Sequence, residues 1–202
     1  MSHRLLALVL ALLATSASAA EDRPSRADLQ KALSLYERSG VRVRGSREAG
    51  PGIIVGAEGQ VLTSVRHVSL EAAQVEYGGK TLPATVVLAN AYLKVAVVAA
   101  PPGTYPAAPV KVSEESPAGQ WLIGIRQGRG KQKDRPESAR ARKAPEPFID
   151  VDLMLPAGSP LFDTSGRLVA VCVQRRGPGC RALPLDAVKR QLAATPQRVA
   201  TP

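Results

Sequence analysis

The sequence carries few imidazole and thiol side chains, the groups that most often bind zinc and that act as bases or nucleophiles near neutral pH. Among its 202 residues there are two histidines and two cysteines. His3 lies in an N-terminal stretch that we expect to be removed, so any imidazole chemistry in the mature chain must use His67. Only His67 could then join the two cysteines as a ligand, which disfavours a metal site. We therefore expect neither a metal nor a cofactor.

The two cysteines, Cys172 and Cys180, lie close together in the run VCVQRRGPGC. An even number of cysteines favours a disulfide in an oxidising compartment. Residues 175–179 should turn the chain back, and equal arms from Arg176 would place the cysteines opposite each other on adjacent strands. There they would be within bridging distance. The alternative is a pair of reduced, buried thiols.

The first 20 residues, MSHRLLALVLALLATSASAA, have the composition of a secretory signal peptide. Arg4 provides a positive start, Leu5 to Ala14 form an apolar run, and Ala17 to Ala19 offer small residues for cleavage. The run is too short to cross a bilayer, which needs about 20 residues, and the alternative is an uncleaved anchor. No later stretch could span a membrane. We therefore expect a soluble, exported protein, periplasmic or secreted.

Glycine and proline are frequent, with 17 residues of each. That many turn-forming residues argue against a helical bundle or coiled coil and favour short strands joined by turns. Aromatic residues make up only 3% of the chain, which disfavours nucleic-acid binding through stacked rings. The formal charge of +10 leaves anionic partners open but says nothing about the fold.

A helix is expected at each end of the folded chain. Ser25 and Asp28 form an S-x-x-D cap for a helix over 25–39, which Gly40 ends. A closing helix is expected over 184–192, with a proline at its first position.

Between these helices the apolar residues come in short runs separated by turns. Gly78 and Gly79 separate two such runs and predict a two-residue hairpin. A spacing of about ten residues favours a β-sandwich or a pair of small barrels. The expected strands cover 41–44, 53–55, 61–63, 74–77, 80–82, 84–88, 95–99, 110–112, 121–125, 148–153, 167–173 and 181–183.

Five stretches follow one another in a distinctive order. They read GPGIIVGAEGQVLTSVRHV from residue 50, TLPATVVLANAYLKVAVVAA from residue 81, PAGQWLIGI, FIDVDLMLPAGSPLFDTSGRLVAV and RALPLDAVKRQL. In this order they resemble the histidine element, the acid-bearing strand, a central strand, the nucleophile loop and the closing strand and helix of trypsin-like serine proteases of the HtrA type. The resemblance covers about residues 41–192. It implies an all-β fold, a trypsin-like double β-barrel with one N-terminal and one C-terminal helix.

With the signal peptide, the resemblance divides the chain into four segments. They are a signal peptide (1–20), an N-terminal helix (21–40), an HtrA-type protease-fold domain (41–194) and a flexible tail (195–202). No PDZ domain is expected, because the chain ends ten residues after Leu192. Oligomeric proteolysis that depends on a PDZ domain is therefore not expected.

A Ser-His-Asp triad needs a nucleophilic hydroxyl, an imidazole that takes its proton, and a carboxylate that orients the imidazole. The resemblance puts His67 at the base position, one residue later after Gly59 than is usual in the family. It puts Lys94 where the carboxylate belongs. A cation cannot accept the imidazole N–H, so the acid position is lost. Asp150 or Asp152 would be a substitute, but nothing in the sequence places either beside the ring.

The nucleophile position is also changed. The family reads Gly-Asn-Ser-Gly-Gly-Pro-Leu where this chain reads LPAGSPL over 155–161. A count without gaps puts Ala157 at the nucleophile and Ser159 at the second glycine. A rival alignment deletes both glycines and makes Ser159 the nucleophile, directly before Pro160. Two residues are also missing before Ala157, in the loop that supplies a glycine N–H to the oxyanion hole.

The segment 126–143 concentrates positive charge. Its eight basic residues are opposed only by Asp134 and Glu137, which gives a local charge of +6. The ordinary interpretation is a solvated loop. The functional one is a contact for anionic lipid headgroups, acidic envelope polymers or an acidic protein. The candidate polyanion-binding residues are Arg126, Arg129, Lys131, Lys133, Arg135, Arg140, Arg142 and Lys143.

These observations favour an exported pseudoprotease that keeps a trypsin-like fold and acts as a binding module. Its partner would be a protein, a peptide or an anionic envelope component, and nucleic acid is not expected. One alternative is an active serine endopeptidase that uses His67 and Ser159. Two others are an envelope protein that binds polyanions through residues 126–143, and an inert envelope protein that keeps the fold for stability or assembly.

Overall fold

The computed structural model describes residues 23–69, 73–128 and 132–194. The predicted signal peptide and the predicted tail lie outside the described residues. Within those ranges, no helix combines the length and the apolar character that a membrane crossing requires.

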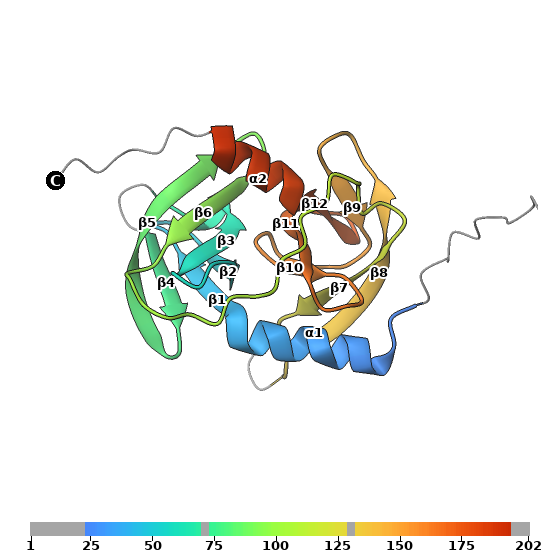
Figure 1. Ribbon diagram of the computed structural model, residues 1–202, viewed down its shortest axis with the longest axis horizontal. Helices are drawn as coiled ribbons and strands as arrows, with labels where there is room; N and C mark the ends of the chain where they lie inside the picture. Colours follow the sequence, from blue (N-terminus) through green and yellow to red (C-terminus); the bar gives the residue numbers. More distant parts are fainter. Residues whose placement is uncertain (1–22, 70–72, 129–131, 195–202) are drawn as a thin grey trace, which may run out of the picture.

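The described strands form two closed barrels, which lie side by side in Figure 1. The first contains β1 (Gly40–Arg44), β2 (Ala49–Ile54), β3 (Gln60–Ser64), β4 (Ala73–Tyr77), β5 (Lys80–Asn90) and β6 (Val95–Ala99). The second contains β7 (Trp121–Arg126), β8 (Arg135–Lys143), β9 (Ile149–Val151), β10 (Pro160–Phe162), β11 (Leu168–Arg176) and β12 (Gly179–Pro184). The strands pair in the orders β1-β2-β3-β6-β5-β4 and β10-β11-β12-β9-β8-β7.

The first helix, α1 (Arg26–Ser39), connects the two barrels along one side of the molecule (Figure 1). Its predicted cap is confirmed: Ser25 Oγ accepts the N–H of Asp28 at 3.2 Å, and the Asp28 carboxylate accepts the N–H of Ser25 at 2.8 Å. The helix buries Ala32 and Tyr36. It packs mainly against β7 and β8 and also reaches β1 and β2.

The closing helix, α2 (Leu185–Ala194), lies at the opposite side of the view from α1 (Figure 1). It begins one residue later than predicted, because Pro184 is the last residue of β12. The helix packs against β11 and β12. The prediction of an all-β double barrel with one helix at each end is therefore confirmed.

Three hydrophobic clusters hold this arrangement together. One draws only on the first barrel and another only on the second. The third combines side chains of both helices and both barrels, including Leu35, Leu62, Val97, Phe162, Val171 and Val188. This shared core fixes the two barrels against each other, so a site between them is built on a rigid support.

Several predicted strands differ from the structure. Residues 110–112 form no strand, and Val110 makes only an isolated bridge with Leu168. The two runs at 80–82 and 84–88 are one strand, β5, with a bulge between Val86 and Leu88. Strands β8 and β10 were not expected. The hairpin at Gly78 and Gly79 is confirmed as the β4–β5 turn.

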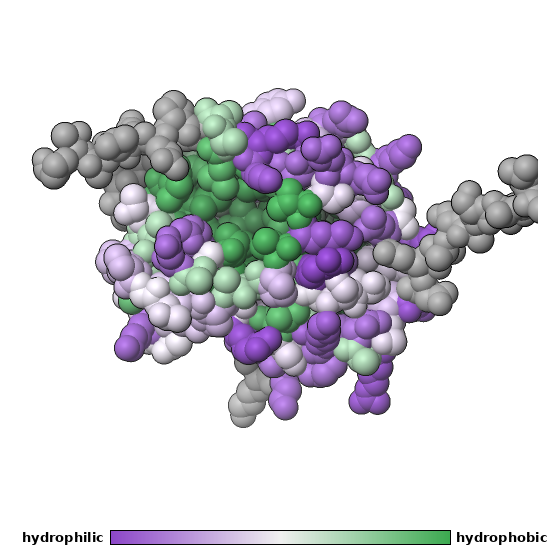
Figure 2. Space-filling model, viewed as in Figure 1, coloured by the Kyte–Doolittle hydropathy of each residue, from purple (hydrophilic) through white to green (hydrophobic). Residues whose placement is uncertain are grey.

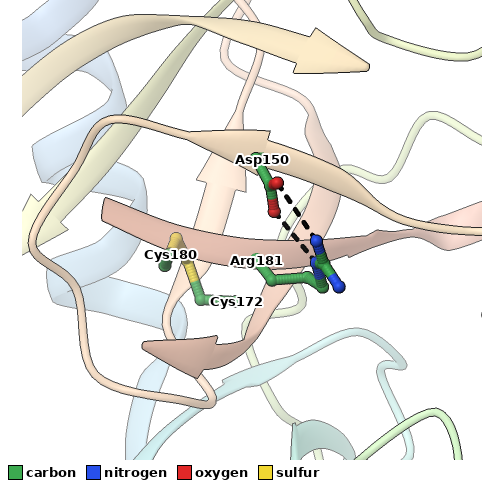
Figure 3. The surroundings of a disulfide bond; sticks show 4 residues. All are labelled: Asp150, Cys172, Cys180 and Arg181. Atoms are coloured by element: carbon green, nitrogen blue, oxygen red, sulfur yellow. Dashed lines mark hydrogen bonds and ion pairs between the residues drawn. A yellow bond between two sulfur atoms is a disulfide. The ribbon is translucent and has the colours of Figure 1, made fainter. Parts of the chain in front are cut away.

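The hairpin of β11 and β12 carries a disulfide between Cys172 and Cys180 (Figure 3). The disulfide prediction is confirmed, and the alternative of reduced thiols is wrong. The predicted register is also wrong, because Cys180 pairs with Arg175 and Cys172 pairs with Ala182. A bulge between Cys172 and Gln174 shifts the register, and the Cα atoms of the two cysteines are 6.0 Å apart.

The polar and apolar parts of the surface are unevenly distributed. In the view of Figure 2, apolar residues gather over the first barrel beside α2, whereas hydrophilic residues predominate over the second barrel. The second barrel also contains Arg126, at the end of β7, and residues 135–143 of the basic segment, which form β8.

Candidate functional site

His67 ends a short 3₁₀ turn, η1 (Val65–His67), directly after β3. Ser64 caps this turn, and its Oγ accepts the N–H of Arg66 at 3.4 Å. The His67 side chain is only 5% exposed, so the ring is packed into the edge of the first barrel.

A hydroxyl group binds the ring atom that the carboxylate of a triad would bind. Thr63 Oγ1 donates to the carbonyl oxygen of Pro51 at 2.8 Å and lies 3.2 Å from Nδ1 of His67. Because a hydroxyl has a single hydrogen, Thr63 can only accept from the ring. Nδ1 therefore carries the proton, and Nε2 of the neutral ring keeps its lone pair.

Two glycines leave space for this arrangement. A Cβ atom at Gly50 would overlap the imidazole ring of His67. A Cβ atom at Gly158 would overlap the carbonyl oxygen of Pro51 and would lie 3.2 Å from Nδ1 of His67. Gly158 also has a φ of +86°, which side chains other than glycine rarely adopt. Gly158 therefore lies close to Pro51, Thr63 and His67 of the first barrel.

Burial lowers the pKa of His67 below its ordinary value of 6.5, because the enclosed ring loses the hydration that stabilises its charged form. Glu48 and the carbonyl of Pro51 act in the opposite direction, whereas Arg66 and Arg42 add to the lowering. The imidazole is therefore mainly neutral at pH 7. Sequence analysis missed both Thr63 and Glu48, since neither stands at a triad position of the family.

Lys94 stands at the predicted acid position, with its backbone in the left-handed region at a φ of 58°. Its ammonium donates to Oε1 of Gln174, on β11, at 2.6 Å. Its carbonyl oxygen accepts the N–H of Val65 at 3.2 Å and the hydroxyl of Ser64 at 3.3 Å. The backbone of Lys94 thus holds the turn that leads to His67, while its side chain binds the second barrel.

The two carboxylates considered as substitutes are engaged in the second barrel. Asp150 pairs with Arg181 at 3.0 and 3.2 Å (Figure 3), and this hydrogen bonding lowers the pKa of the Asp150 carboxyl. Asp152 pairs with Arg142. The imidazole of His67 has its hydrogen-bond contact with Thr63 instead.

The two candidate nucleophile positions lie in different surroundings. Ala157 lines the same cleft as His67. Ser159 is 1% exposed, and its Oγ has no hydrogen-bond partner among the described residues. Its carbonyl oxygen accepts the N–H of Cys172 at 2.8 Å, which attaches the residue to β11. The cleft therefore presents the methyl group of Ala157, whereas Ser159 is buried and does not line it.

The backbone N–H of the residue two before Ala157 is already engaged in a hydrogen bond within its own loop. The N–H of Leu155 donates to the carbonyl oxygen of Leu153 at 2.8 Å. The count without gaps puts Leu155 at the family's glycine, whose N–H belongs to the oxyanion hole. Pro156, which lies between Leu155 and Ala157, has no backbone N–H and cannot donate a hydrogen bond.

The cleft has a volume of about 940 Å³ and takes its lining from both barrels. Among the described residues, six of its lining side chains are basic and one, Glu48, is acidic. The basic residues are Arg42, Arg66, Arg126, Lys133, Arg135 and Arg175. Among the residues that the structure describes, no group of three or more His, Cys, Asp or Glu side chains is placed to hold a metal ion.

The expectation of a solvated loop over 126–143 is wrong for residues 135–143, which form β8 between β7 and β9. The predicted basic cluster is also divided. Arg126, Lys133 and Arg135 line the cleft, whereas Arg140 lies 5.9 Å from the centre of the Trp121 ring and Arg142 pairs with Asp152. Arg129 and Lys131 lie outside the described residues.

Three of the cleft's basic residues were missed by sequence analysis. Arg42 comes from β1, Arg66 from η1 and Arg175 from β11. Arg42 and Arg175 each have a second arginine in the same strand, Arg44 and Arg176, but all three cleft residues lie far along the chain from 126–143. Only the closure of the two barrels brings them together, so no local pattern of charge could have identified them.

The chain was compared with protein families, curated proteins and solved structures. The family model described as a trypsin-like peptidase domain matches residues 50–171, which is more than half of the chain. No curated protein matches. Among solved structures, the serine endoprotease from Yersinia pestis is 17% identical with a TM-score of 0.71, over 86% of this chain and 67% of that one.

The Rv3671c protease of M. tuberculosis H37Rv is similar in two inactive forms. One form is 22% identical with a TM-score of 0.68, over 86% of this chain and 97% of that one. The other, a serine-to-alanine mutant, is 20% identical with a TM-score of 0.69, over 90% of this chain and 98% of that one. At such identities the structural similarity shows the double-barrel fold alone. The match to the family model shows which family the chain belongs to. The chain therefore belongs to the trypsin-like peptidase domain family.

Proposed function

We propose that the chain is an exported pseudoprotease, which binds a protein or peptide segment in the cleft between its barrels and does not hydrolyse it. One observation carries this proposal. The imidazole of His67 shares the cleft with the methyl group of Ala157, while Ser159 is buried and is not among the residues that line the cleft.

The missing nucleophile has the largest chemical consequence. Acyl transfer needs an oxygen that can reach the scissile carbonyl and pass its proton to the imidazole. A methyl group can do neither, and removing a triad nucleophile lowers turnover by about 10⁶-fold. Ser159 would have to leave a position that is 1% exposed before its oxygen could take over this role.

The hydrogen-bond partner of Nδ1 of His67 also supports the lack of hydrolysis. A carboxylate at Nδ1 stabilises the imidazolium that forms during catalysis, and a wrong partner there lowers turnover by about 10⁴-fold. Here Nδ1 meets the neutral hydroxyl of Thr63, 3.2 Å away. Arg66 and Arg42 further disfavour the charged ring. The histidine is thus better suited to a neutral, structural role than to that of a general base.

The oxyanion site supports the proposal independently. Each N–H donor in an oxyanion hole contributes about 10²–10³ in rate. The N–H of Leu155 already donates to Leu153 at 2.8 Å and is not available to a tetrahedral intermediate. Nucleophile, acid and oxyanion donor are therefore all altered, although the family's fold is kept.

Export is proposed from two features. The first 20 residues have the composition of a signal peptide. The disulfide between Cys172 and Cys180 is of a kind that forms in oxidising compartments.

A casein digestion tests the lack of hydrolysis. The purified mature chain is incubated with fluorescein-labelled casein, and fragments are followed by fluorescence and mass spectrometry. We expect no fragments above the level of a His67→Ala variant. Fragments that the unaltered chain produces, and that disappear in both His67→Ala and Ser159→Ala, would contradict the proposal and establish a serine endopeptidase.

A further inference from the structure

The charges around the cleft are strongly one-sided. Of the described residues that line it, six are basic and one, Glu48, is acidic. All six basic side chains are exposed, so their charges face the solvent of the cleft. Like charges crowded around a concave surface repel one another, and a bound anion relieves that repulsion.

Half of these cations already have an acidic partner. Arg42 lies 3.8 Å from Glu76, Arg66 lies 2.9 Å from Glu48, and Arg126 lies 2.7 Å from Glu137. The other half do not. Among the residues that the structure describes, Lys133, Arg135 and Arg175 make no ion pair, and all three belong to the second-barrel side of the cleft. These three positions have donors free for an incoming carboxylate.

The cations outside the cleft provide a contrast within the same barrel. Arg142 pairs with Asp152, Arg181 pairs with Asp150, and Arg140 lies against the ring of Trp121. These three cations outside the cleft are already engaged, whereas Lys143 and Arg176, which do not line the cleft, make no ion pair among the described residues.

The lining is not purely charged, which bears on the class of ligand. Met154 is 50% exposed and lines the cleft together with Pro156, Ala157 and Ala49. An exposed methionine offers an adaptable apolar contact. A polyphosphate or acidic glycan has charge but no side chain for such a contact, whereas a polypeptide can supply both apolar and acidic groups.

We infer that the cleft binds an acidic segment of a polypeptide, with carboxylate side chains against Lys133, Arg135 and Arg175 and an apolar side chain against Met154. The inference rests on the proposed function, since a ligand held in this cleft must stay uncleaved. Arginine accounts for two of the three contacts and can bind a carboxylate through two parallel N–H donors.

A peptide titration tests the inference. The probe is a fluorescein-labelled peptide that mixes glutamate with alanine and leucine, and matched probes carry glutamine or lysine in place of glutamate. Binding is followed by fluorescence anisotropy at low and moderate salt. We expect the glutamate peptide to bind at least about 10-fold more tightly than the glutamine peptide, with the difference shrinking as salt is added.

A pair of double variants locates the site. Arg135→Gln combined with Arg175→Gln should weaken binding of the glutamate peptide by about 10-fold or more. Arg140→Gln combined with Arg142→Gln removes the same charge outside the cleft and should change the affinity by less than about 2-fold. All four side chains are exposed, so neither variant should prevent folding.

The outcomes separate this inference from the proposed function. Equal binding of the three peptides, equal losses in the two double variants, or full competition by inorganic polyphosphate at matched charge would overturn the acidic-polypeptide assignment. Intact recovery of the peptide would leave the pseudoprotease proposal standing in each case. Cleavage of the glutamate peptide, measured by mass spectrometry, would instead overturn the proposed function and support the acidic preference.

Discussion

The two barrels contribute very different side chains and backbone groups to the cleft. The first barrel holds a buried histidine, with the hydroxyl of Thr63 at Nδ1 and Gly50 under the ring. The second barrel offers the methyl group of Ala157, and the N–H of Leu155 is bonded within its own loop. The histidine is present in the first barrel, but its Nδ1 meets a hydroxyl, and the second barrel offers a methyl group to the cleft.

Packing explains this difference. The ring of His67 fills the space above Gly50, so replacing it with a smaller side chain would leave a cavity in the first barrel. A nucleophile's hydroxyl projects into a cleft and fills no core. Its loss costs little stability. Replacing this histidine should therefore cost more stability than replacing a side chain that only lines the cleft.

The largest loss of stability is expected at Gly158, where the second barrel contacts the first. Gly158→Ala places a Cβ atom on the Pro51 carbonyl and strains a backbone at φ +86°, which should lower the free energy of unfolding by about 3 kcal/mol. Urea unfolding measures this loss. Gly78→Ala is the control, with a φ of +56° and open space around it, and should lose about 1 kcal/mol. Equal losses in both variants would show that the contact between the halves contributes nothing.

The disulfide should stabilise the second half selectively. Replacing both Cys172 and Cys180 with alanine frees a loop with a sequence separation of 8 residues, which should lower the free energy of unfolding by about 2–3 kcal/mol. Hydrogen exchange should accelerate mainly in β10, β11 and β12. An equal acceleration in β1 to β6 would mean that the two barrels respond as one unit.

The hydroxyl at Nδ1 should stabilise the first half. Thr63→Val keeps the shape of the side chain but leaves Nδ1 of His67 and the Pro51 carbonyl without this partner. We expect a loss of about 1–2 kcal/mol in the free energy of unfolding. Thr63→Ser keeps the hydroxyl and should recover most of it. If the serine variant loses as much as the valine variant, the hydrogen bonds are not the cause.

The smallest effect concerns pH. The pKa of His67 is lowered in the folded chain, so below pH 6.5 the unfolded chain takes up a proton that the folded chain does not. The free energy of unfolding should therefore fall as the pH drops below 6.5, by at most about 1.4 kcal/mol per pH unit from this group. His67→Gln should flatten this part of the profile. Identical slopes for the two chains would assign the loss to other groups.

Most of the fold could be predicted from local patterns. The cap at Ser25, the hairpin at Gly78 and the apolar runs of both barrels are short-range signals, and the structure confirms them. Strand β8 was missed because Ala141 is its one buried residue, so no apolar alternation marks it. Strand β10 has three residues and begins with a proline, which is too short for a pattern to appear.

The candidate site was predictable only where it lies in a recognisable stretch of sequence. His67 and Ala157 were identified by their places in motifs. Thr63 as partner of the ring and Arg175 as part of the cleft depend on how the barrels close, and a single sequence does not encode that in any local spacing. The N–H of Leu155 could not be placed either. Its hydrogen bond to Leu153 depends on the local backbone turn, which the shorter loop in the sequence does not predict.

Covalent labelling tests the central claim most directly. The mature chain is treated with a serine-reactive fluorophosphonate, and the peptide that contains residues 157–159 is examined by mass spectrometry. The account predicts no adduct on this peptide, in the unaltered chain or in Ser159→Ala. A stoichiometric adduct on Ser159 that is lost in Ser159→Ala would contradict it, because the buried hydroxyl would then be a working nucleophile.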